Sequence, residues 1–257
     1  MKLTADFHTH TVFSHGKGSI LDNALEAKSK GLSKIAITDH GHGHTVYGIR
    51  SKKVPFMKEL CKEATEKTRV EVLLGVEANI LGVSGKTDMK ERDMEYMDVY
   101  LAGIHKLIAY DKLKEWFMLF GKNFTARHFH KPSQSLIKRN TEVYINAIKQ
   151  NPIDILTHPG FCVFINAYDV AKCCEDYGTL FEIDARKKHL EDDEWEAVLK
   201  TNVKFVIDSD AHSPEKIGVI GQAEELIKRV GIPTDRILNI DGKFPQNLRF
   251  SEFKRKM

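Results

Sequence analysis

The stretch Leu3–Phe7, LTADF, is a short apolar run that leads directly into His8-Thr9-His10. Further runs rich in apolar and β-branched residues recur along the chain: Lys34–Thr38, Glu71–Val76, Asp98–Ile104, Ile153–Thr157, Thr179–Ile183 and Val203–Ile207. Runs of this length without strict polar–apolar alternation are typical of strands that are buried on both faces. The sequence therefore predicts a parallel sheet, with a His-x-His pair at the carboxyl end of its first strand.

The segments between these runs have the spacing of amphipathic helices. Ser19-x-x-Asp22 is a capping-box pattern, and Gly31 is a stop signal. We expect the other helices at Met57–Lys67, Thr141–Gln150, Ala167–Tyr177, Glu191–Lys200 and Gly221–Val230. Strands and helices that alternate along one chain favour the α/β class, with the parallel sheet closed into a (β/α) barrel. No linker or repeat interrupts the alternation, so we predict a single domain over 1–257.

The irregular part of the pattern is 106–140, which is too long for a plain connection. It carries eight Lys or Arg residues against Asp111 and Glu115, a local net charge of +6. Aromatic residues are interleaved with these charges: Trp116, Phe117, Phe120, Phe124 and Phe129. We predict a functional insertion or lid here, whose rings pack against the barrel rather than stack on a substrate.

The composition is that of an ordinary globular protein. Lys and Arg total 39 and Asp and Glu total 36 in 257 residues, so the formal net charge is only +3. This balance disfavours a dedicated nucleic-acid-binding protein, which would carry a strong basic excess. The four cysteines form no C-x-x-C pair, which favours buried thiols in a reducing compartment. With no long apolar run and no apolar signal region near the first residues, we expect a cytoplasmic protein without a membrane segment.

Metal-ligand residue types follow the predicted strands, at the edge where sites form in parallel α/β folds and barrels. In chain order they are His8, His10, His15, His40, Glu77, His105, His158, Asp210 and His212. Imidazole and carboxylate together suit Zn, Mn or Fe, and the absence of cysteine among them disfavours a purely structural zinc site. Nine ligands exceed the four or so that one zinc ion takes. We therefore expect two or three divalent ions.

Other histidines do not share this placement. His189 is interpreted as a solvated surface residue, whereas four others are candidates for contact with a substrate: His42, His44, His128 and His130. Asp39 directly precedes His40 and is expected to orient a ligand imidazole.

The ordered motifs resemble the PHP superfamily, named for polymerase and histidinol phosphatase. The resemblance rests on Asp6-Phe7-His8-Thr9-His10-Thr11, Ile37-Thr38-Asp39-His40-Gly41, Gly75-Val76-Glu77-Ala78-Asn79, Gly103-Ile104-His105, Thr157-His158-Pro159-Gly160 and Asp208-Ser209-Asp210-Ala211-His212. The GVEANI stretch and the late Arg236-Ile237-Leu238-Asn239 look most like the small stand-alone bacterial phosphatases of this family. The resemblance implies a distorted seven-stranded barrel with a trinuclear metal site.

Carried over to this chain, the resemblance implies three ligand sets. His8, His10, Glu77 and Asp210 would hold the first ion; Glu77 would bridge to the second, with His105 and His158; and His15, His40 and His212 would hold the third. Many members have aspartate at the position of His15, although histidine also occurs there in the trinuclear subgroup. The insertion departs from the more compact members and leaves the substrate open.

The implied reaction is hydrolysis of a phosphate monoester by a metal-bridged hydroxide. Cationic side chains are expected to complete the phosphate site, with Arg186 and Arg127 favoured over Lys106 and Lys131, because arginine makes bidentate phosphate contacts. The expected partner is a small phosphorylated substrate, and the sequence leaves the oligomeric state open.

Three other functions compete with this one. A histidinol-phosphate phosphatase would use the same centre and differ only in its pocket. An amidohydrolase-type barrel also opens with His-x-His, but the lysine that bridges its metals has no good counterpart here. A module that processes single-stranded nucleic acid would use the basic, aromatic insertion to bind its strand by charge and stacking.

Overall fold

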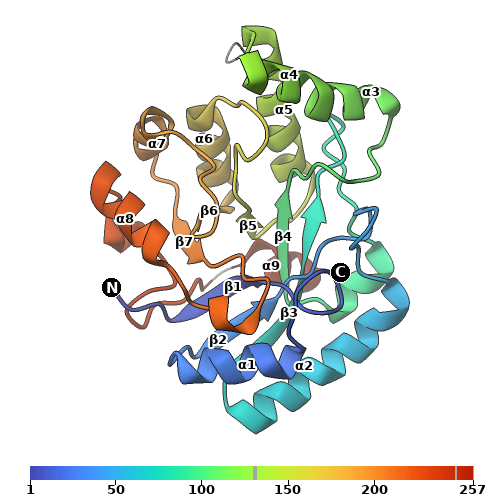
Figure 1. The fold of residues 1–257 in the computed structure, drawn as a ribbon, viewed down its shortest axis with the longest axis vertical. Coiled ribbons are helices and arrows are strands. Elements are labelled where there is room, and N and C mark those ends of the chain that lie inside the picture. The colour runs from blue at the N-terminus through green and yellow to red at the C-terminus, as the bar shows by residue number, and fades with distance from the viewer. Residues whose placement is uncertain (130–131, 247, 257) are drawn as a thin grey trace.

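Seven parallel strands form the centre of the molecule (Figure 1). The computed structural model describes residues 1–129, 132–246 and 248–256. Each strand pairs with the next one along the chain: β1 (Ala5–Thr9), β2 (Lys34–Ile37), β3 (Glu71–Asn79), β4 (Val99–Gly103), β5 (Ile155–Leu156), β6 (Leu180–Asp184) and β7 (Phe205–Asp208). All seven predicted strands are confirmed, and so is the α/β class with a nearly closed seven-stranded barrel.

The barrel closes between β1 and β7 through few contacts. The His10 N–H donates to the Ala211 carbonyl at 2.8 Å. The buried Asn239 adds a side-chain clasp: its Nδ2 donates to the carbonyls of Ala5 and Ile207, and its Oδ1 accepts from the Ile207 N–H. Because Ala5 belongs to β1 and Ile207 to β7, one amide side chain holds the two ends of the sheet together.

The pairing of β1 with β2 is irregular. Asp6 is in register with Ile35, but Thr9 is in register with Ile37, so β1 uses one more residue than β2 over this stretch. Such a bulge disturbs the regular alternation of side chains and re-aims one of them. His8 lies in the bulge, and its ring reaches Glu182 on β6.

The interior of the barrel is divided into an apolar and a polar part. A small apolar cluster takes one or two side chains from every strand except β3 and packs against residues near the C-terminus; its members are Ala5, Phe7, Ala36, Val99, Leu101, Ile155, Leu180 and Val206. Side chains two residues further along a strand share its face. The residues that follow Leu180 and Val206 in this way are Glu182 and Asp208, and both are fully buried. The polar part therefore begins one step above the apolar layer, toward the carboxyl ends of the strands.

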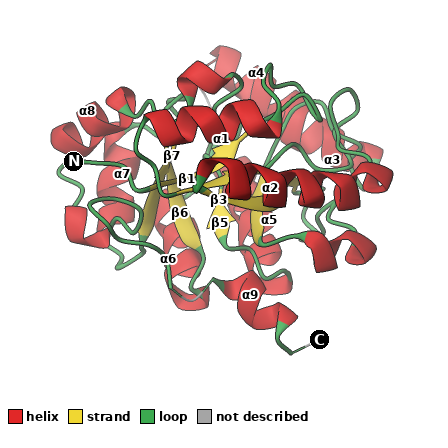
Figure 2. Ribbon diagram, turned by 90° about the horizontal axis from the view of Figure 1, so that it is seen from below, coloured by secondary structure: helices red, strands yellow, loops and turns green. Residues whose placement is uncertain are grey.

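Helices surround the strands (Figure 2). They are α1 (Ile20–Ser29), α2 (Val54–Thr68), α5 (Gln134–Gln150), α6 (Ala167–Tyr177), α7 (Asp192–Leu199), α8 (Gly221–Val230) and α9 (Arg249–Lys254). The capping box of α1 is confirmed, and α6 and α8 have the predicted bounds, each ending at a left-handed glycine. In the described part of the chain, no helix is both long and apolar enough to cross a membrane.

The predicted insertion is largely helical. It contains α3 (Leu113–Trp116), a π-helical turn η3 (Phe117–Gly121) and α4 (Lys122–Phe129), and these lie at one end of the molecule in Figure 1. Its last residues belong to α5, which begins at Gln134 rather than Thr141 because Ser133 caps it by accepting from the Leu136 N–H. His130 and Lys131 lie outside the described residues.

Loss of the Asn239 clasp should destabilise the barrel. Asn239→Ala leaves buried backbone groups of Ala5 and Ile207 without partners, so we expect the free energy of unfolding to fall by about 2–4 kcal/mol. Urea denaturation followed by circular dichroism measures this change. Asn202→Ala, at an exposed position, is the control and should change stability by less than about 0.5 kcal/mol. Equal effects of the two substitutions would contradict the role of the clasp.

Candidate metal centre

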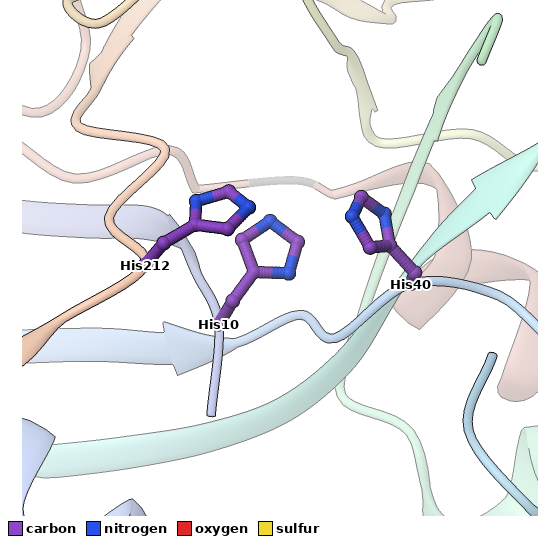
Figure 3. A group of neighbouring side chains, drawn as sticks. All are labelled: His10, His40 and His212. Atoms are coloured by element: carbon purple, nitrogen blue, oxygen red, sulfur yellow. The ribbon is translucent and has the colours of Figure 1, made fainter. Parts of the chain in front are cut away.

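Histidine, aspartate and glutamate side chains gather at the carboxyl ends of the strands. Four overlapping groups have their ligand atoms within 4.8 Å of one another: His8–His10–Asp210, His8–Glu77–His158, His40–Glu77–His105 and His10–His40–His212. Figure 3 shows the last group, whose three rings come together from three separate segments of the chain. Eight of the nine predicted ligands therefore take part in these groups.

Glu77 lies at the middle of the cluster. Its Oε1 is 2.9 Å from His105 Nε2 and 2.8 Å from His158 Nε2, and its Oε2 is 2.7 Å from His40 Nδ1. The Nε2 atom of His8 is 3.3 Å from Oε1. One fully buried carboxylate thus has imidazoles on both of its oxygens, which is the arrangement that a ligand bridging two ions requires.

Asp210 is the second carboxylate of the cluster. Its Oδ1 is 3.2 Å from His10 Nε2, 3.5 Å from His8 Nε2 and 3.4 Å from His212 Nδ1. The residue has φ of 46°, in the left-handed region that side chains with a Cβ rarely adopt. Strain of this kind persists only where the surroundings hold it, and it is common at functional sites.

His15 joins the cluster through ring contacts. Its ring stacks on that of His40, with centroids 4.9 Å apart and planes 6° from parallel, and it meets the His212 ring at 4.1 Å. It belongs to none of the four groups defined by ligand-atom distances among the described residues. The structure therefore places His15 beside His40 and His212, the other two residues of the predicted third set. It does not place His15 in a group of three whose ligand atoms all lie within 4.8 Å of one another.

The cluster suits divalent cations because its facing atoms are not satisfied by the protein. Within the described part of the chain, several buried ligand atoms lie close to one another without the geometry of a hydrogen bond: Nε2 of His8 and His10, Nδ1 of His40, Oε2 of Glu77 and Oδ1 of Asp210. Buried polar atoms normally have partners, and an orphaned one is costly. Nitrogen and carboxylate donors that face one another in this way match zinc, manganese or iron.

The protonation states also fit metal binding. Burial holds the pKa of His10 and His158 well below the usual value, and it lowers the pKa of His15 to about 3 and that of His212 to about 4. His8 differs: burial opposes its ionisation, but the carboxylates of Glu77, Glu182 and Asp210 raise its pKa well above the usual value, so an ion bound there would displace a proton. Burial opposes ionisation of Glu77, but the surrounding imidazoles hold its pKa well below the usual range. Neutral imidazole and ionised carboxylate are the forms that bind metals.

Glu182 orients two of the histidines and was not predicted. Its Oε1 accepts from His8 Nδ1 at 2.7 Å, and its Oε2 accepts from the His158 backbone N–H at 2.6 Å. A carboxylate can only accept here, so Nδ1 carries the proton of His8 and Nε2 is left free to bind an ion. Asn79 pairs with His105 Nδ1 in the same manner, at 2.7 Å. A glutamate in the middle of an otherwise apolar strand was the available signal for Glu182.

Asp39 acts on the loop after β1 rather than directly on an imidazole. Its Oδ1 accepts from the Thr11 N–H at 2.7 Å and from Ser14 Oγ at 2.5 Å, and its Oδ2 accepts from Thr11 Oγ1 at 2.5 Å. Its separation from His10 Nδ1 is 4.0 Å, which is too long for a hydrogen bond. Asp39 therefore holds the loop that carries His10 and His15.

Two cations face Asp210 at the rim. Arg186 Nη1 is 2.9 Å from Asp210 Oδ2 and 3.4 Å from His212 Nε2. Lys187, which was not predicted, pairs with the same oxygen, and its Nζ lies 4.8 Å from the centre of the Phe161 ring. Positive charge thus stands beside the cluster at the rim. Arg127 does not join it: it lines a hollow on the His105 side.

The remaining histidines are placed differently from one another. The prediction for His189 is wrong, because its side chain is buried against Trp195 and its Nδ1 pairs with the Pro159 carbonyl at 2.8 Å.

The histidines that were candidates for substrate contact differ in their surroundings. His42 is held between the Ile49 carbonyl and Asp93, so its nitrogens are not available to a substrate. His44 stacks on His40 at the rim, with centroids 4.8 Å apart, and His128 is exposed beside Phe129. His130 lies outside the described residues.

Comparison with known proteins gives the family. The PHP domain matches residues 6–185. The chain belongs to the PHP domain family. A probable phosphatase of Thermoanaerobacter sp. (strain X514) is 33% identical over 274 residues, covering 100% of this chain and 98% of the relative. A probable phosphatase of Caldanaerobacter subterraneus is 31% identical over 93% of this chain and 88% of the relative. The predicted resemblance to the bacterial phosphatases of this family is confirmed.

A solved PHP-type structure has the same fold. Histidinol phosphate phosphatase from Lactococcus lactis, solved with zinc, L-histidinol and phosphate, superposes with a TM-score of 0.60 at 14% identity. The superposition covers 90% of this chain and 95% of that one. Because the two sequences are only 14% identical, the superposition shows that the two proteins share an arrangement of strands and helices.

Removal of the Glu182 carboxylate should weaken metal binding. Glu182→Gln places a donor against either the His8 Nδ1–H or the His158 N–H, so at least one of these groups loses its orienting partner. We expect zinc affinity to fall about 10- to 100-fold, as is usual when the group that orients a ligand is lost. Competition with a chromophoric chelator measures this affinity. Glu63→Gln, at an exposed site on α2, is the control, and an equal loss there would contradict the assignment.

Burial of His189 should make stability depend on pH. Burial lowers its pKa to about 4, whereas the unfolded chain takes up this proton below about pH 6.5. Acidification from pH 6.5 to 4 therefore favours the unfolded state, by at most about 3 kcal/mol from this group. His189→Asn keeps a donor for Pro159 but cannot titrate. Urea denaturation across this pH range should show a shallower fall in stability for the variant, and parallel curves would contradict the prediction.

Proposed function

We propose that this chain is a metal-dependent phosphatase that hydrolyses phosphate monoesters. The observation that carries the proposal is the buried Glu77, whose two oxygens face imidazoles from different strands. Full-length relatives described as probable phosphatases support the reaction class. The cationic side chains at Asp210 support an anionic substrate.

The proposed load is two or three divalent ions. The first set comprises His8, His10, Glu77 and Asp210; the second comprises Glu77, His105 and His158; and the third comprises His15, His40 and His212. The group His8–His10–Asp210 falls within the first set, and the presence of Glu77 in two groups supports its role as a bridge, whereas the other three groups each combine residues of two sets. Zinc, manganese and iron all suit these donors, and the zinc bound by the Lactococcus lactis enzyme favours zinc.

Bound ions of this kind lower the pKa of a coordinated water toward 7 and neutralise charge on the phosphate oxygens. The protein's own part is placement. Glu182 and Asn79 fix the ring orientations of His8 and His105, and Asp39 holds the loop that carries His10. Arg186 is placed to donate to a phosphate oxygen, and Lys187 adds a second charge beside it. Arg127 lines a hollow next to His105.

The proposed substrate is a small phosphorylated molecule. L-Histidinol phosphate is the second candidate, because the Lactococcus lactis enzyme of similar fold was solved with L-histidinol and phosphate. Direct assay of L-histidinol phosphate within a panel of phosphate monoesters separates a general phosphatase from a histidinol-phosphate phosphatase.

Metal analysis and activity together test the proposal. Protein purified without chelator should hold two to three ions per chain by plasma mass spectrometry and should hydrolyse p-nitrophenyl phosphate. Chelation should abolish the activity, and zinc or manganese should restore it. His8→Ala and His10→Ala should each lower kcat/KM at least 100-fold, because each removes a proposed ligand of the first ion. Circular dichroism shows whether the variants stay folded. Undiminished hydrolysis by folded variants would overturn the proposal.

A further inference from the structure

A small hollow of about 80 Å³ lies between the insertion and the rim of the barrel. Its lining includes His105, Lys106, Phe120, Phe124, Arg127 and Phe161. The hollow adjoins the metal centre, because His105 Nε2 is 2.9 Å from Glu77 Oε1. Phe161 also contacts the centre, with its ring edge-on to His158 at 5.3 Å. A group bound in the hollow would therefore lie next to an ester held at the centre.

The insertion presents the rings of Phe120 and Phe124 to this hollow, and Trp116 lies beside Phe120 without lining the hollow itself. Trp116 and Phe120 lie 5.7 Å apart, and Phe120 and Phe124 lie 6.1 Å apart with planes at 29°. The helices pack inward through other side chains, Leu119 and Ala126, whereas Trp116 is 42% and Phe124 65% exposed. The prediction that these rings pack against the barrel is wrong. They form a surface on which another flat group can stack.

Two cations at the hollow, Lys106 and Arg127, lie apart from the acidic residues that the structure describes. Among the described residues, no carboxylate lies within ion-pair distance of Lys106 or Arg127; each instead lies over an aromatic ring, that of Phe161 or Phe164. The acids of the insertion are engaged elsewhere: Glu115 binds Arg139 at 2.6 Å, and Asp111 accepts from Ser84 Oγ at 2.6 Å. The positive charge of the hollow is therefore free to bind an anion.

We propose that this hollow binds the leaving group of the ester, and that it selects an alcohol bearing a single aromatic ring and a second anionic group. The inference rests on the proposed phosphatase function. Aromatic faces favour the ring, Lys106 and Arg127 favour a carboxylate or a second phosphate, and the small size of the hollow favours a small group. Arg186 and Lys187 already face Asp210, so the two cations of the hollow are additional to those beside the metal centre.

Kinetics on matched esters test the selection. Phenyl phosphate carries only the ring, 4-carboxyphenyl phosphate adds a carboxylate, and 1,4-phenylene bisphosphate adds a phosphate. We expect Arg127→Gln to lower the ratio of kcat/KM for at least one doubly charged ester over phenyl phosphate by about tenfold. Lys122→Gln removes a charge from the same helix outside the hollow and should leave the ratio unchanged. The ratio for each variant is compared with the same ratio for the unsubstituted protein, so differences in leaving-group acidity between the esters cancel. An unchanged ratio in Arg127→Gln, or an equal fall in Lys122→Gln, would overturn the inference.

Binding of a product provides a readout that does not need hydrolysis. Calorimetric titration of 4-hydroxybenzoate into the full chain, with inorganic phosphate present to occupy the centre, should show tighter binding than titration of phenol. Phe120→Leu and Arg127→Gln should each weaken it several-fold, whereas Phe117→Leu, in the same turn but outside the hollow, should not. Binding that depends on Arg127 without hydrolysis of any ester would refute the phosphatase function and leave the hollow supported. Hydrolysis with no preference for 4-hydroxybenzoate over phenol would refute the hollow alone.

Discussion

Burial of the Glu77 carboxylate is the constraint on which the site depends. A lone buried carboxylate would be neutralised by a proton, because removal of its charge from water is costly. Here imidazoles from several strands compensate the charge and hold the pKa of Glu77 well below its usual range. Burial holds the pKa of His10 and His158 well below the usual value, whereas the carboxylates around the equally buried His8 raise its pKa well above the usual value. Glu77, His10 and His158 are thus held in their metal-binding forms, and an ion bound by His8 would displace a proton.

The barrel holds Glu77 and the surrounding histidines in fixed positions relative to one another. Parallel strands that pair in chain order bring residues far apart in sequence to one rim of the barrel. An apolar layer fills the barrel interior beneath this rim and supports the side chains above it. The polar layer starts on the strands themselves, with Glu182 and Asp208 on the same inner face as the apolar residues before them. Orienting groups therefore stand on strands, where they are held more firmly than on loops.

Sequence reasoning found the strands and the ligand residues because both follow simple patterns. Apolar runs mark the strands, and the first residues after them are of the types that bind metals. It missed Glu182 and Lys187, since a contact across the barrel depends on which strand faces which. His189 was misassigned because its hydrogen-bond partner, the Pro159 carbonyl, lies on a loop distant in sequence, and because its packing against Trp195 depends on how the chain enters α7. The aromatic residues of the insertion were identified, but their exposure depends on how a helix with a π-helical turn is rotated.

The clasp at the seam of the barrel has a consequence for how the molecule is made. Asn239 reaches back across 234 positions of sequence to the Ala5 carbonyl. During synthesis the first strand emerges long before the residue that fastens it to the last one. Until then His8 and His10 have no fixed relation to Asp210, which also comes late in the chain. Ion capture by the complete cluster is therefore an event that follows translation of nearly the whole chain, so an unfinished chain lacks the complete ligand set.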